Sequence, residues 1–374
     1  MSLALPALES IAARVVREFG AAPCAVVACG FRRSDGWHVA DGAHGRLTPD
    51  GPLACTQTPF DLASVTKPFA ALTLARLVRQ QLLTWDTQLG VPLRDVHGTP
   101  SAHVSLELLA AHRAGLDGHR PLYRPLKEGR PVDRLAALRE AGMARRPDCQ
   151  GEPPSGEGFE PTYSDLGYLL IGEAMSRSTR TALDLLIERE VCEPLALGVT
   201  SSRRWGARDS SFLQRVAPTE VVSWRGGVVR GAVHDENAWA IAGDGVCAHA
   251  GLFGTAADVV RFGTAVLDVV AGRRDEWLCP HDIQPVLRSR PGGTLLAGFD
   301  GKSANGSSAG QRCSASSFGH LGFTGTSLWM DPSANVVLAL LTNRVHPTRT
   351  IEAIKEARPE VHDALHAWAT VQAA

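Results

Sequence analysis

Ser64 and Lys67 combine the residue types and the spacing that nucleophilic catalysis requires. Residues three positions apart are neighbours on a helix surface, so the Lys67 amine can reach the Ser64 hydroxyl. A serine hydroxyl is a poor nucleophile unless a base removes its proton as it attacks. A buried lysine can be that base if burial and nearby cations lower its pKa from about 10.4. A capping serine followed by a surface lysine would show the same spacing, so the pair alone does not establish a site.

A second candidate segment is Tyr163-Ser164-Asp165, which begins a helical pattern about a hundred residues further on. Tyr163 could exchange a proton with Ser64 or with a leaving group if Lys67 holds the tyrosine near ionisation. The alternative is a partly buried tyrosine, with Ser164 or Asp165 capping the helix.

A third candidate segment runs from Gly319 to Thr326 and contains His320. Glycines within a strand indicate a close approach of the backbone to a ligand or to another segment. A free N–H on an edge strand here could face Ser64 and act as the second donor of an oxyanion hole. The alternative is a glycine-rich bend with a structural histidine.

The elements that must position these residues follow from the hydrophobic pattern. Apolar runs and alternation predict strands at 24–31, 36–44, 327–332 and 335–343. Helical periodicity predicts an amphipathic N-terminal helix with Leu8, Ile11, Val15 and Phe19 on one face, followed by helices at 64–83, 105–112, 132–141, 164–176, 181–190 and 351–371. Residues 147–162 and 301–317 are rich in Gly, Pro or Ser and are expected to be loops.

This order predicts an α+β fold in which both chain ends share one antiparallel sheet. The terminal helices would cover the sheet, and a mainly helical region would be inserted between the two ends. We therefore expect an α/β part formed by residues 1–58 and 295–374 and a mainly helical part formed by residues 59–294. Together they would form one compact unit, with a cleft between the parts where active sites often lie.

Composition excludes several classes of function. The chain has 374 residues and a formal net charge of −1, so it lacks the basic surplus of a nucleic-acid or acidic-membrane binder. No apolar run approaches the roughly 18 residues of a transmembrane helix. Glu9 and Arg14 interrupt the N-terminal apolar run, and no basic segment precedes it, so we expect a cytoplasmic protein. The eight scattered cysteines predict buried thiols rather than a disulfide framework.

The order and separation of the three segments resemble the serine hydrolases of the class C β-lactamase-like family. That family includes penicillin-binding DD-peptidases, D-aminopeptidases and esterases, and a related motif set occurs in other β-lactamases. The resemblance extends from about residue 58 to residue 347. It is carried by the segments PFDLASVTKPFAAL, LLAAHRAGL, TYSDLGYLLIGEAM, VAPTE, VHDENAWA, AHAGLFGTAADVVRF, GHLGFTGTSLWMDP and LLTNRVHP.

The resemblance implies a role for each motif residue. Ser64 matches the acylated nucleophile, and Lys67 matches its proton partner. Tyr163 matches the tyrosine that assists acylation and deacylation. His320 and Gly322 match the ends of the third motif.

Phe323, directly after the third motif, would contribute the second oxyanion N–H beside that of Ser64.

Two residues depart from the family pattern. Asp165 stands where many members have Asn, so a group that only accepts hydrogen bonds replaces an amide and could pair with Lys67. His320 replaces the lysine of β-lactamases proper and removes a fixed positive charge. Both departures disfavour efficient β-lactam hydrolysis.

The histidines and acidic residues show no recognised metal-ligand spacing. Isolated residues of this kind are usually capping or hydrogen-bonded core groups, and the resemblance also implies neither a metal nor another cofactor. His234 to Asn237 and His249 to Phe253 match one branch of the family, but no role is assigned to them. The residues considered and set aside as metal ligands are His112, His119, His234, Asp235, Glu236 and His249.

The sequence therefore predicts a cofactor-free serine acyl hydrolase acting on a small ester, amide or peptide. One alternative is a β-lactamase or DD-carboxypeptidase acting on penicillins or peptidoglycan peptides. Another is a non-catalytic binding protein on the same fold, because fold and motif do not establish turnover. Activity should rise with pH as the coupled Lys67/Tyr163 pair loses a proton. The natural substrate and the oligomeric state are left open.

Overall fold

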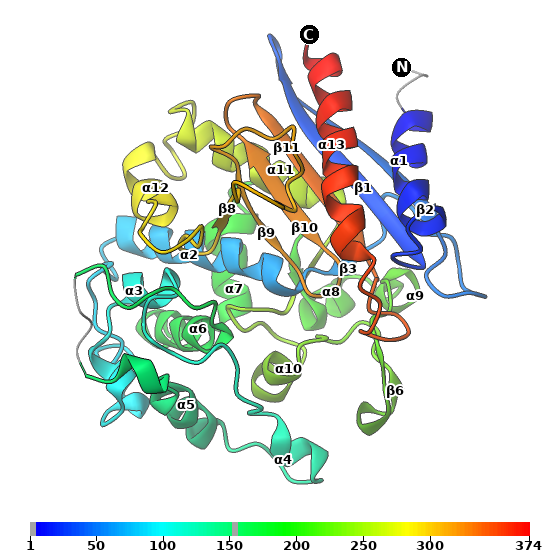
Figure 1. The fold of residues 1–374 in the computed structure, drawn as a ribbon. Coiled ribbons are helices and arrows are strands. Elements are labelled where there is room, and N and C mark those ends of the chain that lie inside the picture. The colour runs from blue at the N-terminus through cyan, green and yellow to red at the C-terminus, as the bar shows by residue number, and fades with distance from the viewer. Residues whose placement is uncertain (1–4, 152–155) are drawn as a thin grey trace.

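A six-stranded antiparallel sheet joins the two ends of the chain in the computed structural model, which describes residues 5–151 and 156–374 (Figure 1). Strand β1 pairs with β11 from Ala25 opposite Thr342 to Phe31 opposite Val336, and this pairing confirms the expected sheet. Across the sheet the strands are β2 (Gly36–Gly45), β1 (Cys24–Arg33), β11 (Val336–Thr342), β10 (Ser327–Asp331), β9 (Phe318–Leu321) and β8 (Asp300–Gly301).

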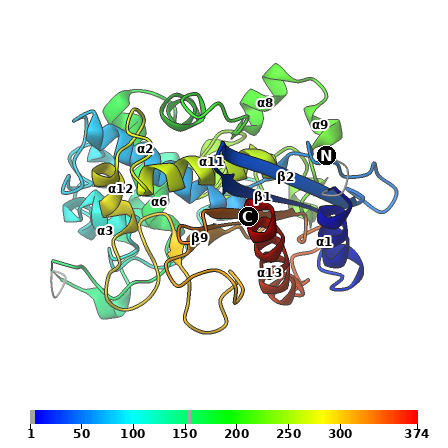
Figure 2. The same ribbon diagram turned by 90° about the horizontal axis from the view of Figure 1, so that it is seen from above.

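Both faces of the central strands are buried, so these strands are apolar throughout rather than alternating. Val27 and Cys29 belong to a core shared with the two terminal helices, whereas Val26 and Ala28 belong to the larger core on the opposite face. The side-chain period of two along a strand produces this division. The helices that cover the sheet are α1 (Leu5–Arg17) and α13 (Ile354–Ala373) on one face and α11 (Ala256–Val270) on the other (Figure 2).

Helix α11 contacts the sheet through a glycine that leaves no room for a side chain. A Cβ atom on Gly263 would lie 2.5 Å from a methyl group of Val337 in β11. Helix α11 lies within residues 59–294, the part that was expected to be mainly helical. This part therefore also covers the second face of the sheet. The division into two parts stays a prediction.

The remaining helices form a layer beside the sheet, and Figure 1 shows α2 running between this layer and the strands. Every predicted helix has a counterpart, although several are shorter than expected. The helices are α2 (Thr66–Arg79), α3 (Leu106–Ala110), α4 (Arg124–Lys127), α5 (Arg134–Met143), α6 (Asp165–Thr179), α7 (Leu183–Ile187), α8 (Ser202–Arg208), α9 (Phe212–Arg215), α10 (Glu236–Ala242) and α12 (Pro280–Leu287).

Short strands and single turns connect these helices. A turn of π-helix at Glu188–Cys192 extends α7. The short strands are β3 (Phe60–Asp61), β7 (Leu252–Gly254) and β4 (Thr200–Ser201) in one sheet and β5 (Val221–Val222) and β6 (Gly227–Val228) in another. The 3-10 turns are η1 (Ala63–Val65), η2 (Arg94–Val96), η3 (Pro100–His103), η4 (Pro147–Cys149) and η6 (Ser223–Arg225).

Residues 152–155 of the predicted 147–162 loop, and residues 1–4 before α1, lie outside the described residues. All eight cysteines are free thiols, and six of them are buried. Over the described ranges, none of the helices has both the length and the apolar composition that crossing a bilayer requires.

Substituting Gly263 by Ala should lower the free energy of unfolding by about 1–3 kcal/mol, because the added methyl group overpacks the contact with Val337. Gly206 in α8 is the matched control, since a Cβ atom there would meet nothing within 4 Å. Gly206→Ala should leave stability unchanged or raise it by up to about 1 kcal/mol. Urea unfolding of both variants measures the difference. Equal stability of the two variants would contradict the close contact.

Candidate active site

Ser64 lies in the 3-10 turn η1, directly before α2, and Lys67 is the second residue of α2. The Lys67 ammonium donates a hydrogen bond to the Ser64 hydroxyl oxygen over 3.0 Å. The Lys67 side chain is completely buried. Ala63 enters the turn with a φ of +47°, a backbone conformation that costs free energy for a residue with a Cβ atom. The pair expected from the i, i+3 spacing is thus formed at a strained turn.

The turn that carries Ser64 is held by the side chain of Asp61. One Asp61 carboxylate oxygen accepts a hydrogen bond from the Ala63 N–H over 2.8 Å, and the other accepts from the His234 N–H over 2.7 Å. Burial raises the pKa of Asp61 and these two N–H groups oppose the rise. Asp61 was missed as a site residue, although an aspartate two residues before the bonded N–H is the signal of an Asx-turn.

The end of β9 is joined to the same turn through backbone carbonyls. The Thr324 hydroxyl donates to the Asp61 carbonyl over 2.8 Å, and the Thr326 hydroxyl donates to the Leu62 carbonyl over 2.9 Å. A Cβ atom on Gly322 would lie 2.6 Å from the Leu62 carbonyl oxygen. Gly322 is therefore required for the close approach of β9 to the turn of Ser64.

Asp165, the first residue of α6, forms an ion pair with Lys67 of 2.6 Å. The two residues are 98 positions apart in the sequence, and the pairing suggested by the sequence is confirmed. The Lys67 ammonium also lies 4.6 Å from the centre of the Tyr163 ring and donates to the His249 carbonyl over 3.4 Å. Lys67 therefore links the nucleophile, the tyrosine and the carboxylate.

The protonation of this group differs from the sequence expectation. Burial lowers the pKa of Lys67, as expected, but the charge of Asp165 and the hydrogen bonds of Lys67 to Asp165 and Tyr163 outweigh burial and hold the pKa above its ordinary value. Burial of the hydroxyl raises the pKa of Tyr163, against the opposing charge of Lys67. Hydrogen bonds to Lys67 and Ser64 also favour the tyrosine anion. Both proton-carrying groups are consequently protonated in the resting site at neutral pH.

His320 and His112 flank the tyrosine as neutral imidazoles. Burial, with the nearby charge of Lys67, lowers the pKa of His320 to about 3 and lowers that of His112 as well. His112 accepts a hydrogen bond from the Ser164 N–H over 3.0 Å, and its ring centre lies 4.8 Å from that of Tyr163. His112 was considered only as a metal ligand in the sequence, where nothing local indicates its place beside Tyr163.

Phe323 lies just beyond the end of β9, in the turn that leads to β10. The Gly325 N–H closes this turn by donating to the Gly322 carbonyl over 3.1 Å. The Phe323 side chain is 48% exposed, and its ring stacks on His234 with 5.6 Å between the ring centres. Among the described residues, no backbone or side-chain acceptor engages the Phe323 N–H.

Ser64, Tyr163 and Phe323 border one cavity of about 560 Å³. It brings together every sequence-predicted site residue except Lys67, which lies buried beside Ser64. The lining residues are Ala63, Ser64, His119, Tyr123, Tyr163, Asp165, His234, Asp235, Glu236, Ala250, Leu295, Asp300, His320, Leu321, Gly322, Phe323, Arg344, Arg349 and Arg358.

His234, Glu236 and Arg349 form a charged wall of this cavity together with Glu220, which bonds to His234 and Arg349. The sequence had left His234 and Glu236 without a role. Glu220 accepts from His234 over 3.2 Å and from the Arg349 guanidinium Nε over 2.6 Å, and Arg349 also pairs with Glu236. Hydrogen bonds from His234 and Arg349 outweigh burial and lower the pKa of Glu220 to about 2. Glu220 is the last residue of the segment VAPTE, which carried part of the family resemblance, but the sequence assigned no role to it.

Asp235 and His249 connect this wall to Lys67. Asp235 caps α10 by accepting the Ala238 N–H over 2.7 Å, and the same oxygen lies 3.1 Å from His249 Nε2. The His249 carbonyl in turn accepts the hydrogen bond from Lys67. The two histidine segments therefore support the site through its backbone, and no shared metal position arises from them among the described residues.

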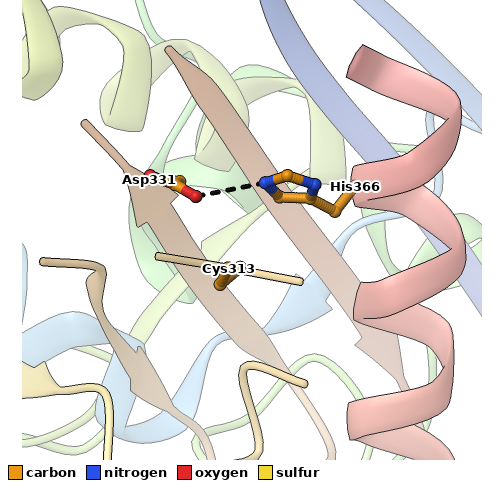
Figure 3. Close-up of side chains that lie close together, drawn as sticks. All are labelled: Cys313, Asp331 and His366. Carbon is orange, nitrogen blue, oxygen red and sulfur yellow. Dashed lines mark hydrogen bonds and ion pairs between the residues drawn. The ribbon is translucent and has the colours of Figure 1, made fainter. Parts of the chain in front are cut away.

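Three possible metal ligands do meet elsewhere, on the far side of the sheet beneath α13 (Figure 3). The donor atoms of Cys313, Asp331 and His366 lie within 4.8 Å of one another. Asp331 already accepts from His366, from the Ser314 hydroxyl and N–H, and from two N–H groups of the following turn. Burial raises the pKa of Cys313 to about 12, so the thiol stays protonated. The cluster is explained as an anchor between α13 and β10.

Comparison with known proteins identifies the family. The profile described as Beta-lactamase matches residues 12–361. The chain belongs to the beta-lactamase family. It is a serine hydrolase by this membership, and the Ser-x-x-Lys pair of the site is typical of the family.

Relatives of this chain carry several activities. An N-acetylmuramyl-L-alanine amidase of Bacillus subtilis (strain 168) is 29% identical over 314 residues, covering 78% of this chain and 69% of the relative. A protein of Escherichia coli (strain K12), assigned provisionally to the D-alanyl-D-alanine carboxypeptidases, is 26% identical over 337 residues, covering 83% and 75%.

Solved structures share the fold. EstCE1, a hydrolase with promiscuous acyltransferase activity, superposes with a TM-score of 0.70 at 19% identity, covering 96% of this chain and 98% of its own. A penicillin-binding protein homologue from Caulobacter crescentus superposes with a TM-score of 0.65 at 19% identity, covering 97% of each chain. The expected β-lactamase/DD-peptidase-like architecture is therefore confirmed.

Replacing Asp165 by Asn should move the acidic limb of the pH profile of kcat/KM to lower pH. The carboxylate raises the pKa of both Lys67 and Tyr163, so its removal lowers both, and the deprotonated pair forms at lower pH. Asp165→Glu keeps the charge and should leave the limb close to that of the wild type. Initial rates with a nitrophenyl ester between about pH 5 and 10 measure the shift. An unmoved limb in Asp165→Asn would contradict this electrostatic role.

Chelation should change neither the activity nor the melting temperature. The carboxylate of Asp331 is occupied by protein donors, so we expect the cluster to act as a structural anchor and not as a site for a divalent cation. Thermal unfolding and ester hydrolysis before and after dialysis against EDTA check this. A loss of either that zinc restores would show that the cluster is a metal site.

Proposed function

We propose that this serine hydrolase cleaves a small ester or amide through an acyl-enzyme on Ser64. The observation that carries the proposal is the hydrogen bond of 3.0 Å between Lys67 and the Ser64 hydroxyl, on the floor of the cavity. Tyr163 reaches the same two groups with its hydroxyl. A nucleophile in contact with two proton carriers is the arrangement that acyl transfer requires.

The reactive form is the minor one in which the Lys67/Tyr163 pair has lost one proton. In acylation the pair takes the proton of the Ser64 hydroxyl as its oxygen attacks the substrate carbonyl, and a tetrahedral oxyanion forms. The pair then gives that proton to the leaving oxygen or nitrogen as the scissile bond breaks. In deacylation it takes a proton from water, whose oxygen attacks the acyl carbon, and returns a proton to Ser64.

The oxyanion is held by the N–H groups of Ser64 and Phe323 in this mechanism. Phe323 is suited to the role because its N–H has no acceptor among the described residues and the residue borders the same cavity as Ser64. The turn of Ser64 and the end of β9 are tied together by Thr324 and Thr326, which keeps the two donors at a constant separation. His320, neutral at physiological pH, supplies no charge for a substrate carboxylate.

An amide, peptide or ester is the substrate class most consistent with the activities of the relatives. A DD-carboxypeptidase or β-lactamase is the second candidate, because one relative is assigned provisionally to the D-alanyl-D-alanine carboxypeptidases. Stable acylation of Ser64 by a penicillin would favour that candidate. The cytoplasmic location stays a prediction, which cell fractionation tests.

A fluorophosphonate should add once to the wild-type chain, and the adduct should be absent from Ser64→Ala. Loss of the nucleophile should also reduce ester hydrolysis by several orders of magnitude. Ser202→Ala is the matched control, because Ser202 is a buried serine whose hydroxyl bonds to the Gly231 carbonyl outside the cavity. Intact-protein mass spectrometry reads the adduct.

Two outcomes would contradict the proposal. An adduct that persists in Ser64→Ala would place the nucleophile elsewhere. A folded wild-type chain that forms no adduct with several probes and hydrolyses no ester, D-amino-acid amide or penicillin would favour the non-catalytic binding protein.

A further inference from the structure

The backbone on either side of the Phe323 N–H is held by two arginines. Arg358 in α13 donates through one terminal nitrogen to the Gly322 carbonyl over 2.8 Å and to the Thr326 carbonyl over 2.9 Å. Arg344 donates through Nε to the Phe323 carbonyl over 2.8 Å. Both guanidinium groups border the cavity.

The Gly322 carbonyl and the Phe323 N–H belong to the same peptide group. A peptide group is planar and trans, so its C=O and N–H point in opposite directions. Whatever fixes the direction of the carbonyl therefore fixes the direction of the N–H. A positive charge on the carbonyl oxygen also strengthens the N–H as a donor, because hydrogen bonds in a chain polarise one another.

Arg358 is unusual in its surroundings. Its side chain is only 8% exposed, yet the acceptors that the structure gives it are neutral carbonyl oxygens rather than a carboxylate. Its Nε is buried without a hydrogen-bond partner among the described residues. Burial and the nearby charge of Arg344 lower the pKa of Arg358 to about 9. The group still carries its charge at neutral pH, and a buried charge of this kind is costly unless another group compensates it.

A developing oxyanion would provide that compensation for the duration of the reaction. It would form at the N–H side of the Gly322–Phe323 peptide group, whose carbonyl side accepts the hydrogen bond from Arg358. Electrostatic stabilisation of this kind acts on the transition state rather than on the bound substrate, because the negative charge is absent before attack.

We propose that Arg358 is a positioning residue of the oxyanion hole, which aims and polarises the Phe323 N–H through the Gly322 carbonyl. The inference rests on the proposed acyl-transfer function of Ser64. In this proposal the buried charge of Arg358 stabilises the transition state of that reaction, and Arg344 holds the Phe323 carbonyl in place.

The test compares Arg358→Met, Arg358→Lys and the control Lys355→Met. Methionine removes the charge and both hydrogen bonds, whereas lysine keeps a charge without the planar guanidinium. Lys355 lies on the same helix, is exposed and, among the described residues, forms an ion pair with Glu352 alone. For Arg358→Met we expect kcat for a neutral nitrophenyl ester to fall about 10- to 100-fold with KM within about twofold, since loss of an oxyanion donor itself costs about 100- to 1,000-fold. Arg358→Lys should recover part of the loss, and Lys355→Met should match the wild type.

A second measurement distinguishes a loss of transition-state stabilisation from general damage to the fold. A boronic acid forms a tetrahedral anionic adduct with the serine, so its affinity should fall by the same factor as kcat/KM. Thermal unfolding of each variant records any loss of structure. If Arg358→Met does not fold, Arg358→Lys carries the test, with the expected losses of kcat and of boronate affinity smaller but still equal.

The inference would be overturned by folded Arg358 variants with wild-type kcat and boronate affinity. It would equally be overturned by an increase in KM confined to esters that carry a carboxylate, which would make Arg358 a direct substrate contact. Failure of the proposed function is distinguishable from both, because it would appear in the wild type as the absence of a Ser64 adduct.

Discussion

The buried ammonium of Lys67 is the charge around which the site is organised. A charge without access to water is strongly destabilising unless other groups replace the lost hydration. Asp165 at the start of α6, the Ser64 hydroxyl and the His249 carbonyl make that replacement. Helix α2, helix α6 and the segment before β7 are consequently drawn to one point, and the nucleophile lies there with them. Asp165 is the charged partner among the three, so its removal would cost the ammonium most of this compensation.

Asp165 distinguishes this site from one in which an amide occupies the same position. An amide would leave the positive charge of Lys67 to be balanced by Tyr163, and would favour the tyrosine anion. The carboxylate balances Lys67 itself and raises the pKa of Tyr163. The resting site is then more stable and less basic. The activity of this chain is therefore expected to appear at higher pH than its nucleophile–lysine pair alone would suggest.

The backbone contacts between the turn of Ser64 and the end of β9 give the site its rigidity. Two threonine hydroxyls and the absence of a side chain at Gly322 bring together segments more than 250 residues apart, and the carboxylate of Asp61 joins the turn of Ser64 to the His234 N–H. Helix α13 adds Arg358 from behind the same peptide groups. The charged wall formed by Glu220, Arg349 and their partners also reaches Phe323, because His234 stacks on the Phe323 ring and Arg344 donates to the Arg349 carbonyl over 3.0 Å.

The sequence by itself determined the features that depend on local geometry. The i, i+3 spacing of Ser64 and Lys67 is a property of helical backbone, and the apolar strands of β1 and β11 follow from burial on both faces. These features, with the family resemblance, were sufficient to predict the fold class. The tertiary structure alone decided the protonation of Lys67, because the compensating carboxylate is 98 residues away. It also decided the contacts of Asp61 and Arg358 and the covering of the sheet by α11. Each of these depends on which distant groups share a low-dielectric interior, and no local pattern records that proximity.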